Sequence, residues 1–107
     1  MKTKALSVLE FEKYCNNFGF NKYIYNTIDQ EDRINNLDAL GIYNSLIVSY
    51  NPNTVLLCEG RNYLCFKNVK SIILHSENKG AGRIFDIICS NVTENKDDRF
   101  TILGLRK

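Results

Sequence analysis

The chain has 107 residues, of which 44% are hydrophobic and 24% charged, and its formal net charge is +2 at pH 7. Such a chain can bury a core as one domain without disulfides or metals. A charge this small does not indicate a dedicated phosphate-binding surface. No apolar run approaches the roughly 20 residues that cross a bilayer, and Glu10, Glu12 and Lys13 interrupt the region where a signal peptide would be apolar. We therefore expect one compact domain over residues 1–107, cytoplasmic and without a membrane partner.

The first predicted element is a helix over residues 8–18. Ser7 and Glu10 form an S-x-x-E capping box, in which each side chain bonds the other residue's backbone N–H. Gly19 supplies the left-handed residue that ends such a helix. An apolar stripe at helical spacing predicts that one face packs on a sheet, and it consists of Val8, Phe11, Tyr14, Cys15 and Phe18.

The segment 53–75 holds three short apolar runs separated by turn residues, which is typical of a β-meander. The segment 29–41 is either a short helix or an ordered loop, because its apolar spacing is helical but Asn35-Asn36 disfavours a helix interior. We expect polar loops at 76–82 and 91–98. The predicted strands are 22–28, 43–50, 54–58, 63–66, 69–74, 83–90 and 100–105.

These elements predict an α+β fold, in which an N-terminal amphipathic helix precedes a strongly bent, mainly antiparallel sheet of five to seven strands. A sheet with one wet face alternates apolar and polar residues, yet runs such as 55–58 and 87–89 are apolar on both faces. One short helix cannot cover both sides. The second face must be closed by curling into a barrel-like form, by residues 29–41, or by another chain, as in a homodimer.

We predict no catalytic, metal or cofactor site. His75 is the only histidine, and the four cysteines lie within apolar runs, where buried thiols are the default. Zinc ligands usually come in closely spaced pairs, which these residues lack. A disulfide between Cys58 and Cys65 is a conceivable alternative, since adjacent strands could bring them together.

The six tyrosines are the main clue to contacts, because tyrosine buries a large ring and keeps a polar group. Lys79 and Arg83 flank two glycines and are candidate anion contacts, although such a loop between two strands is typical of a simple hairpin connection. The candidate interaction surface comprises Tyr23, Tyr25, Tyr43, Tyr50, Arg61, Lys67 and Lys70.

A small bent sheet behind an N-terminal helix resembles the Sm-like arrangement, and the segment FKNVKSIIL at 66–74 is in keeping with it. The uridine-binding signatures of that family are not evident. The first hypothesis is a non-enzymatic protein-interaction module, such as an accessory or inhibitory protein of a phage or mobile element. The alternative is a nucleic-acid-binding module with an Sm-like or small-barrel sheet. An enzyme built around His75, or around the acidic segment of Asp29, Glu31, Asp32 and Asp38, is the third and least supported hypothesis.

Overall fold

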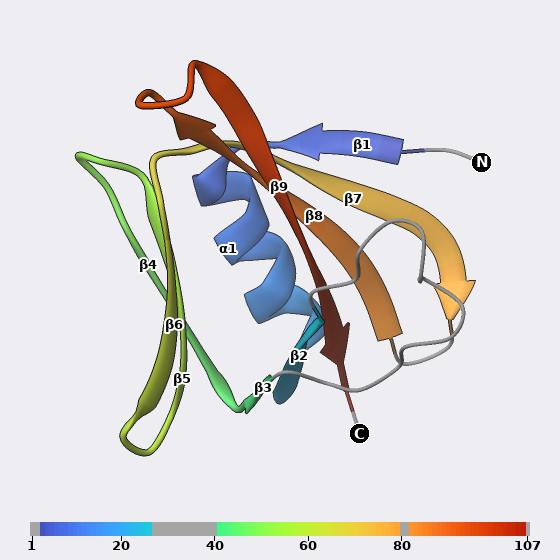
Figure 1. Cartoon of the computed structure of the whole chain (residues 1–107). Coiled ribbons are helices and arrows are strands. Elements are labelled where there is room, and N and C mark those ends of the chain that lie inside the picture. Colours follow the sequence, from blue (N-terminus) through green and yellow to red (C-terminus); the bar gives the residue numbers. More distant parts are fainter. Residues whose placement is uncertain (1–2, 27–40, 80–81, 107) are drawn as a thin grey trace.

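Two antiparallel sheets and one helix make up the computed structural model, which describes residues 3–26, 41–79 and 82–106 (Figure 1). A six-stranded sheet has the order β1-β7-β8-β9-β2-β3, and a three-stranded sheet has the order β4-β5-β6. The predicted α+β class is confirmed, but the sheets are not closed into a barrel. The elements are β1 (Thr3–Leu6), α1 (Val8–Phe18), β2 (Lys22–Asn26), β3 (Gly41–Tyr43), β4 (Ser45–Ser49), β5 (Thr54–Glu59), β6 (Asn62–Lys67), β7 (Val69–Lys79), β8 (Gly82–Asn91) and β9 (Lys96–Leu105).

Helix α1 has the bounds that its sequence signals predict. The Ser7 Oγ accepts a hydrogen bond from the Glu10 amide at 3.1 Å, and the Glu10 Oε1 accepts one from the Ser7 amide at 2.9 Å. Gly19 has a φ of 83°, and its amide donates to the Cys15 carbonyl at 3.0 Å. Phe11 is fully buried, with its ring edge-on to Phe85 at 5.0 Å between centroids. The cap therefore fixes where the helix starts, and Phe11 fixes which face meets the sheet.

Two exposed asparagines mark the corners where the chain passes from one sheet to the other. Asn44 lies between β3 and β4, and Asn68 lies between β6 and β7. The predicted strand 43–50 is therefore two strands, each in a different sheet. Asn68 has a φ of 57°, the left-handed region, whereas Asn44 is not among the residues with positive φ. Each corner turns an extended chain within one residue, so the sheets face each other without a loop between them.

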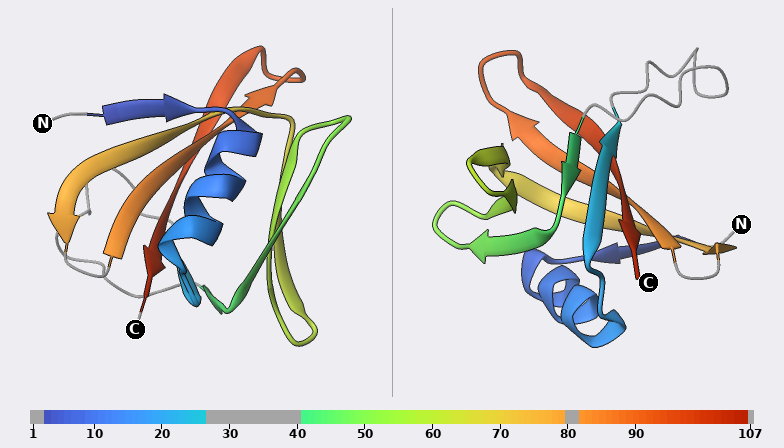
Figure 2. Two further views of the ribbon diagram at one scale, coloured as in Figure 1. Left: turned by 180° about the vertical axis from the view of Figure 1, so that it is seen from behind. Right: turned by 90° about the horizontal axis from the view of Figure 1, so that it is seen from below.

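The core lies between the facing sheets, and α1 lies beside it where β1, β7 and β4 approach the helix (Figure 2). Alternate residues of the central strands point inward: Phe85 and Ile87 are fully buried in β8, as are Val55 and Leu57 in β5. The two sheets thus cover each other's inner faces. This cover comes from two facing sheets and not from one sheet curled into a barrel. The predicted cover by residues 29–41 falls outside the described residues except at Gly41, and cover by another chain stays a prediction.

Strands are longer and more numerous than the apolar runs predict. The expected loop at 76–82 is largely strand, because β7 reaches Lys79 and β8 begins at Gly82, where these two residues pair after a register shift. The expected loop at 91–98 is only a short turn, in which the Glu94 amide donates to the Asn91 Oδ1 at 3.1 Å. Both predictions were wrong because polar side chains are tolerated on the exposed parts of long hairpins. Strand β1 has no counterpart among the predicted strands.

Candidate functional site

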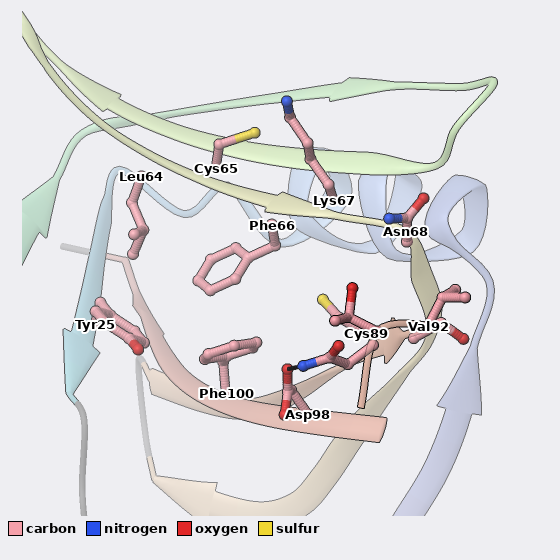
Figure 3. Close-up of a pocket in the computed structure, with 13 residues that line it drawn as sticks. Tyr25, Leu64, Cys65, Phe66, Lys67, Asn68, Cys89, Val92, Asp98 and Phe100 are labelled. Atoms are coloured by element: carbon pink, nitrogen blue, oxygen red, sulfur yellow. Dashed lines mark hydrogen bonds between the residues drawn. The ribbon is translucent and has the colours of Figure 1, made fainter. Parts of the chain in front are cut away.

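A pocket of about 370 Å³ opens between β6 and the end of the β8–β9 hairpin (Figure 3). It exists because β6 and β8 diverge at the Asn68 corner. There the Ser90 amide donates to the Asn68 carbonyl at 2.9 Å. Beyond this bond β6 runs with β5, whereas β8 and β9 continue as a two-stranded hairpin. We call this opening the cleft; helix α1 lies behind it in Figure 3.

Three aromatic rings from three strands form the floor of the cleft. The Phe66 centroid lies 5.1 Å from that of Phe100 and 5.7 Å from that of Tyr25, and Tyr25 and Phe100 are 6.4 Å apart. Phe66 is only 3% exposed, so it supports the other two. Burial, and to a lesser degree Tyr43, raises the pKa of the Tyr25 hydroxyl above its ordinary value. The floor is therefore apolar and uncharged at neutral pH.

The hairpin end of the cleft is polar. Asp98 lines the cleft, and its Oδ2 accepts a hydrogen bond from the Asn91 Nδ2 at 3.0 Å. Burial raises the pKa of the neighbouring Cys89 thiol to about 11, and Asp98 adds to the rise. The Lys67 side chain also borders the cleft, but Figure 3 shows its amino group pointing away from the rings. The cleft thus joins an aromatic floor to one carboxylate.

Strand β6 has a free edge along this cleft. It pairs with β5 through its whole length, and no other described strand pairs with it. An unpaired edge presents backbone N–H and C=O groups that can bond an added strand. The described residues of β6 contain no proline, and their only charged residue is Lys67 at the end. The cleft and the free edge are therefore one continuous surface.

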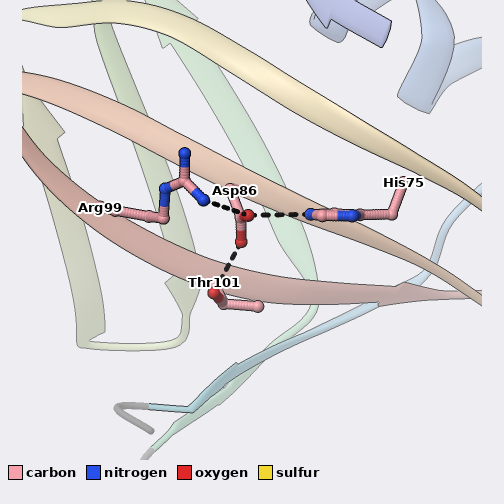
Figure 4. A network of polar contacts seen from close by, with 4 residues as sticks. All are labelled: His75, Asp86, Arg99 and Thr101. Atoms are coloured by element: carbon pink, nitrogen blue, oxygen red, sulfur yellow. Dashed lines mark hydrogen bonds and ion pairs between the residues drawn. The ribbon is translucent and has the colours of Figure 1, made fainter. Parts of the chain in front are cut away.

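A second constellation lies on the face of the six-stranded sheet that points away from the core (Figure 4). Asp86 is only 2% exposed, and its Oδ1 accepts from the Thr101 hydroxyl at 2.7 Å. Its Oδ2 lies 2.8 Å from the His75 Nε2 and 3.5 Å from the Arg99 guanidinium. The carboxylate can orient the imidazole, as in acid–base dyads. Cys89, the nearest cysteine along β8, is buried among the core residues, so this cluster brings no thiol to the histidine.

The seven residues predicted to form one interaction surface are dispersed. Tyr23 is 4% exposed in the core, where its hydroxyl and the Cys15 thiol share a hydrogen bond, so it does not present a surface. Tyr25 and Lys67 border the cleft, and Tyr43 packs half-buried against the core. The remaining three are exposed at separate places, and they are Tyr50, Arg61 and Lys70.

The side chains of Tyr50 and Lys70 each contact a side chain outside the cleft. The Tyr50 hydroxyl donates to the Glu12 Oε1 at 3.4 Å, which links the β4–β5 turn to α1. The Lys70 Nζ lies 2.9 Å from the Asp97 Oδ2, on the side of the hairpin away from the cleft. Sequence reasoning missed Phe66, Phe100 and Asp98 as site residues. Their only signal was their position in or beside predicted strands.

The predicted pair of anion contacts, Lys79 and Arg83, stays a prediction. The side chain of Lys79 lies outside the described residues. The Arg83 guanidinium lies 4.6 Å from the centroid of the Phe18 ring and donates to the Gly82 carbonyl at 2.7 Å. The Arg106 guanidinium lies at the same distance from that ring and donates to the Phe18 carbonyl at 3.2 Å. This hydrogen bond holds Arg106 against the last turn of α1. These contacts give both arginines a structural role.

Comparison of the chain with protein-family models, curated proteins and solved structures found no match. Within the described ranges, no group of three or more His, Cys, Asp or Glu residues could hold a metal ion. The helix of the described part is too short and polar to cross a membrane. All four cysteines are free thiols. The cleft and the free edge of β6 are therefore the features from which a function can be argued.

Proposed function

We propose that this chain is a small non-enzymatic protein-interaction module that binds an extended segment of a partner protein. The segment adds to the free edge of β6, and one of its side chains enters the cleft. The observation that carries this proposal is that the aromatic cleft lies directly beside the free edge of strand β6.

Strand addition divides recognition between backbone and side chains. The backbone bonds hold any extended segment, while a pocket beside the edge selects the side chain. Aromatic residues dominate the energetics of such contacts because they bury a large apolar area. Natural proteins usually protect free edges with prolines, bulges or charges, and β6 carries its single charge only at one end. The edge is therefore suited to a partner strand.

Two further exposed apolar residues flank this surface and extend the area available to a partner. Tyr63 on β6 is 70% exposed, and Val92 at the hairpin turn is 84% exposed. Val92 borders the cleft itself. A phosphate backbone would instead meet the carboxylate of Asp98 here, which is why a protein segment is preferred to nucleic acid. Four free thiols are in keeping with a cytoplasmic location, where thiols stay reduced. There an accessory or inhibitory protein of a phage or mobile element would act by occupying a segment of its partner.

The proposal is tested by selecting binders from a displayed library of random 12-residue peptides and mapping the best by NMR. We expect amide shifts and slowed hydrogen exchange along residues 62–67. Phe100→Ala should weaken the selected peptide by about tenfold or more, as loss of an aromatic anchor does. Tyr50→Ala, which removes an exposed tyrosine away from the cleft, should leave the affinity unchanged. The proposal would be refuted if the selected peptides bind without shifting the amide signals of β6. It would also be refuted if their affinity for a folded Phe100→Ala variant equals that for the unmodified protein.

A further inference from the structure

We infer that the cleft selects a basic side chain, lysine or arginine, from the partner segment. This inference rests on the proposed function and names the residue that the cleft recognises. The alkyl stem lies on the aromatic floor, and the cationic group pairs with Asp98.

The floor suits a long side chain with an apolar stem. The three rings lie within 5.1–6.4 Å of one another, so they touch and form one continuous wall. Lysine and arginine lay their methylene groups on such surfaces while the charged end reaches a polar group. Aromatic rings also attract cations directly, through the negative charge of their faces. A short polar side chain would gain neither contact.

The carboxylate of Asp98 retains capacity for another donor. Its side chain is 35% exposed, and its one hydrogen bond inside the described part of the chain comes from Asn91. The Lys96 ammonium lies 3.9 Å from the Oδ1, beyond hydrogen-bonding distance, and is engaged with Glu94 at 2.9 Å. An ionised carboxylate has about four acceptor positions. Asp98 can therefore accept one or two further bonds from a guanidinium or an ammonium group.

Among the described residues, no basic side chain points into the cleft. Lys67 borders the cleft, but its amino group points outward (Figure 3). The thiol of Cys89 and the hydroxyl of Tyr25 are both neutral at physiological pH, because their ordinary pKa values of 9.0 and 10.0 lie above it and burial raises each pKa further. The cleft therefore offers a ligand the carboxylate of Asp98, whose ion pair with Lys96 at 3.9 Å is not a hydrogen bond. An acidic side chain would be repelled by this carboxylate, and a neutral one would leave its acceptor positions unused.

The test uses three synthetic peptides, acetyl-Thr-Val-Xaa-Val-Thr-amide, in which Xaa is arginine, norleucine or glutamate. Binding is measured from amide shifts at residues 62–67 and 89–100 during titration. We expect the arginine peptide to bind about fivefold more tightly than the norleucine peptide, as for a partly exposed ion pair. The glutamate peptide should bind most weakly. High salt should reduce the preference for arginine, because it screens the pair.

Two substitutions of equal charge separate the roles of neighbouring carboxylates. Asp98→Asn should abolish the preference for arginine over norleucine. Asp97→Asn should preserve the preference, because Asp97 faces the other side of the hairpin and pairs with Lys70. Equal binding of arginine and norleucine to the unmodified protein, or a preference that survives Asp98→Asn, overturns the inference. In either case, amide shifts along β6 would still support the proposed function. If no peptide shifts the amide signals of β6, both the proposed function and this inference are refuted.

Discussion

The Asn68 corner is where β6 and β8 diverge to open the cleft, and its backbone conformation predicts a measurable cost on substitution. Residues with a Cβ pay about 1–2 kcal/mol in the left-handed region, and asparagine pays less than most. Asn68 has a φ of 57°. Its side chain makes no hydrogen bond with the part of the chain that the structure describes. We therefore expect Asn68→Ala to lower the free energy of unfolding by about 1 kcal/mol. Asn68→Gly should be nearly neutral, because relief of the strain offsets the greater entropy of the unfolded chain.

The other corner supplies a matched control. Asn44 is also exposed and also joins two sheets, but it is not among the positive-φ residues. Asn44→Ala should change the free energy of unfolding by less than about 0.5 kcal/mol, as most surface substitutions do. Urea unfolding followed by far-ultraviolet circular dichroism measures all three variants, with the m-value checking that the unfolded state is unchanged. The reasoning fails if Asn44→Ala costs as much as Asn68→Ala, or if glycine at position 68 costs as much as alanine.

Buried and half-buried polar groups give further predictions. Asp86→Ala should lower the free energy of unfolding by about 1–3 kcal/mol, because the donors around the carboxylate lose their acceptor; urea unfolding equal to that of the unmodified protein would contradict this. Stability should fall as pH rises above about 9, because burial raises the pKa of Cys15 from its ordinary 9.0 to about 12 and the unfolded state therefore loses that proton first. Burial also raises the pKa of Tyr23, so the alkaline loss in thermal unfolding should be smaller in Tyr23→Phe. In the native protein at pH 8, Ellman's reagent should modify the two half-buried thiols of β5 and β6 well before those of Cys15 and Cys89; equal rates for all four would contradict the burial.

Local signals made α1 predictable, whereas the division into two sheets was not. The capping box, the apolar stripe and Gly19 all lie within a few residues of the helix they specify. The corners are single exposed asparagines inside otherwise strand-like sequence, without the proline or glycine that usually marks a break. Strand β1 is four residues long and carries a lysine, so only its pairing with β7 makes it a strand.

The cleft was only partly predictable for a similar reason. Tyr25 was selected for its residue type, and Tyr23 was selected with it because alternate residues share a face. Both do point to the inner side, but Tyr23 lies under α1, where it meets Cys15 and Phe20, while Tyr25 meets Phe66 and Phe100 at the opening. That difference depends on β2 pairing with β9, which no local pattern specifies.

The placement of β1 and β2 in the six-stranded sheet has a consequence for the kinetics of folding. Thr3 pairs with His75, and Lys22 pairs with Leu105. Both strands that flank α1 therefore pair with strands that are distant in the sequence. Proteins dominated by such non-local pairings fold in milliseconds to seconds. Helix α1 carries its own caps, but it is only 11 residues long, and its apolar stripe packs on β7 and β8. A helix this short is marginally stable in isolation, so burial of its Phe11 face should coincide with the slow pairing of the strands.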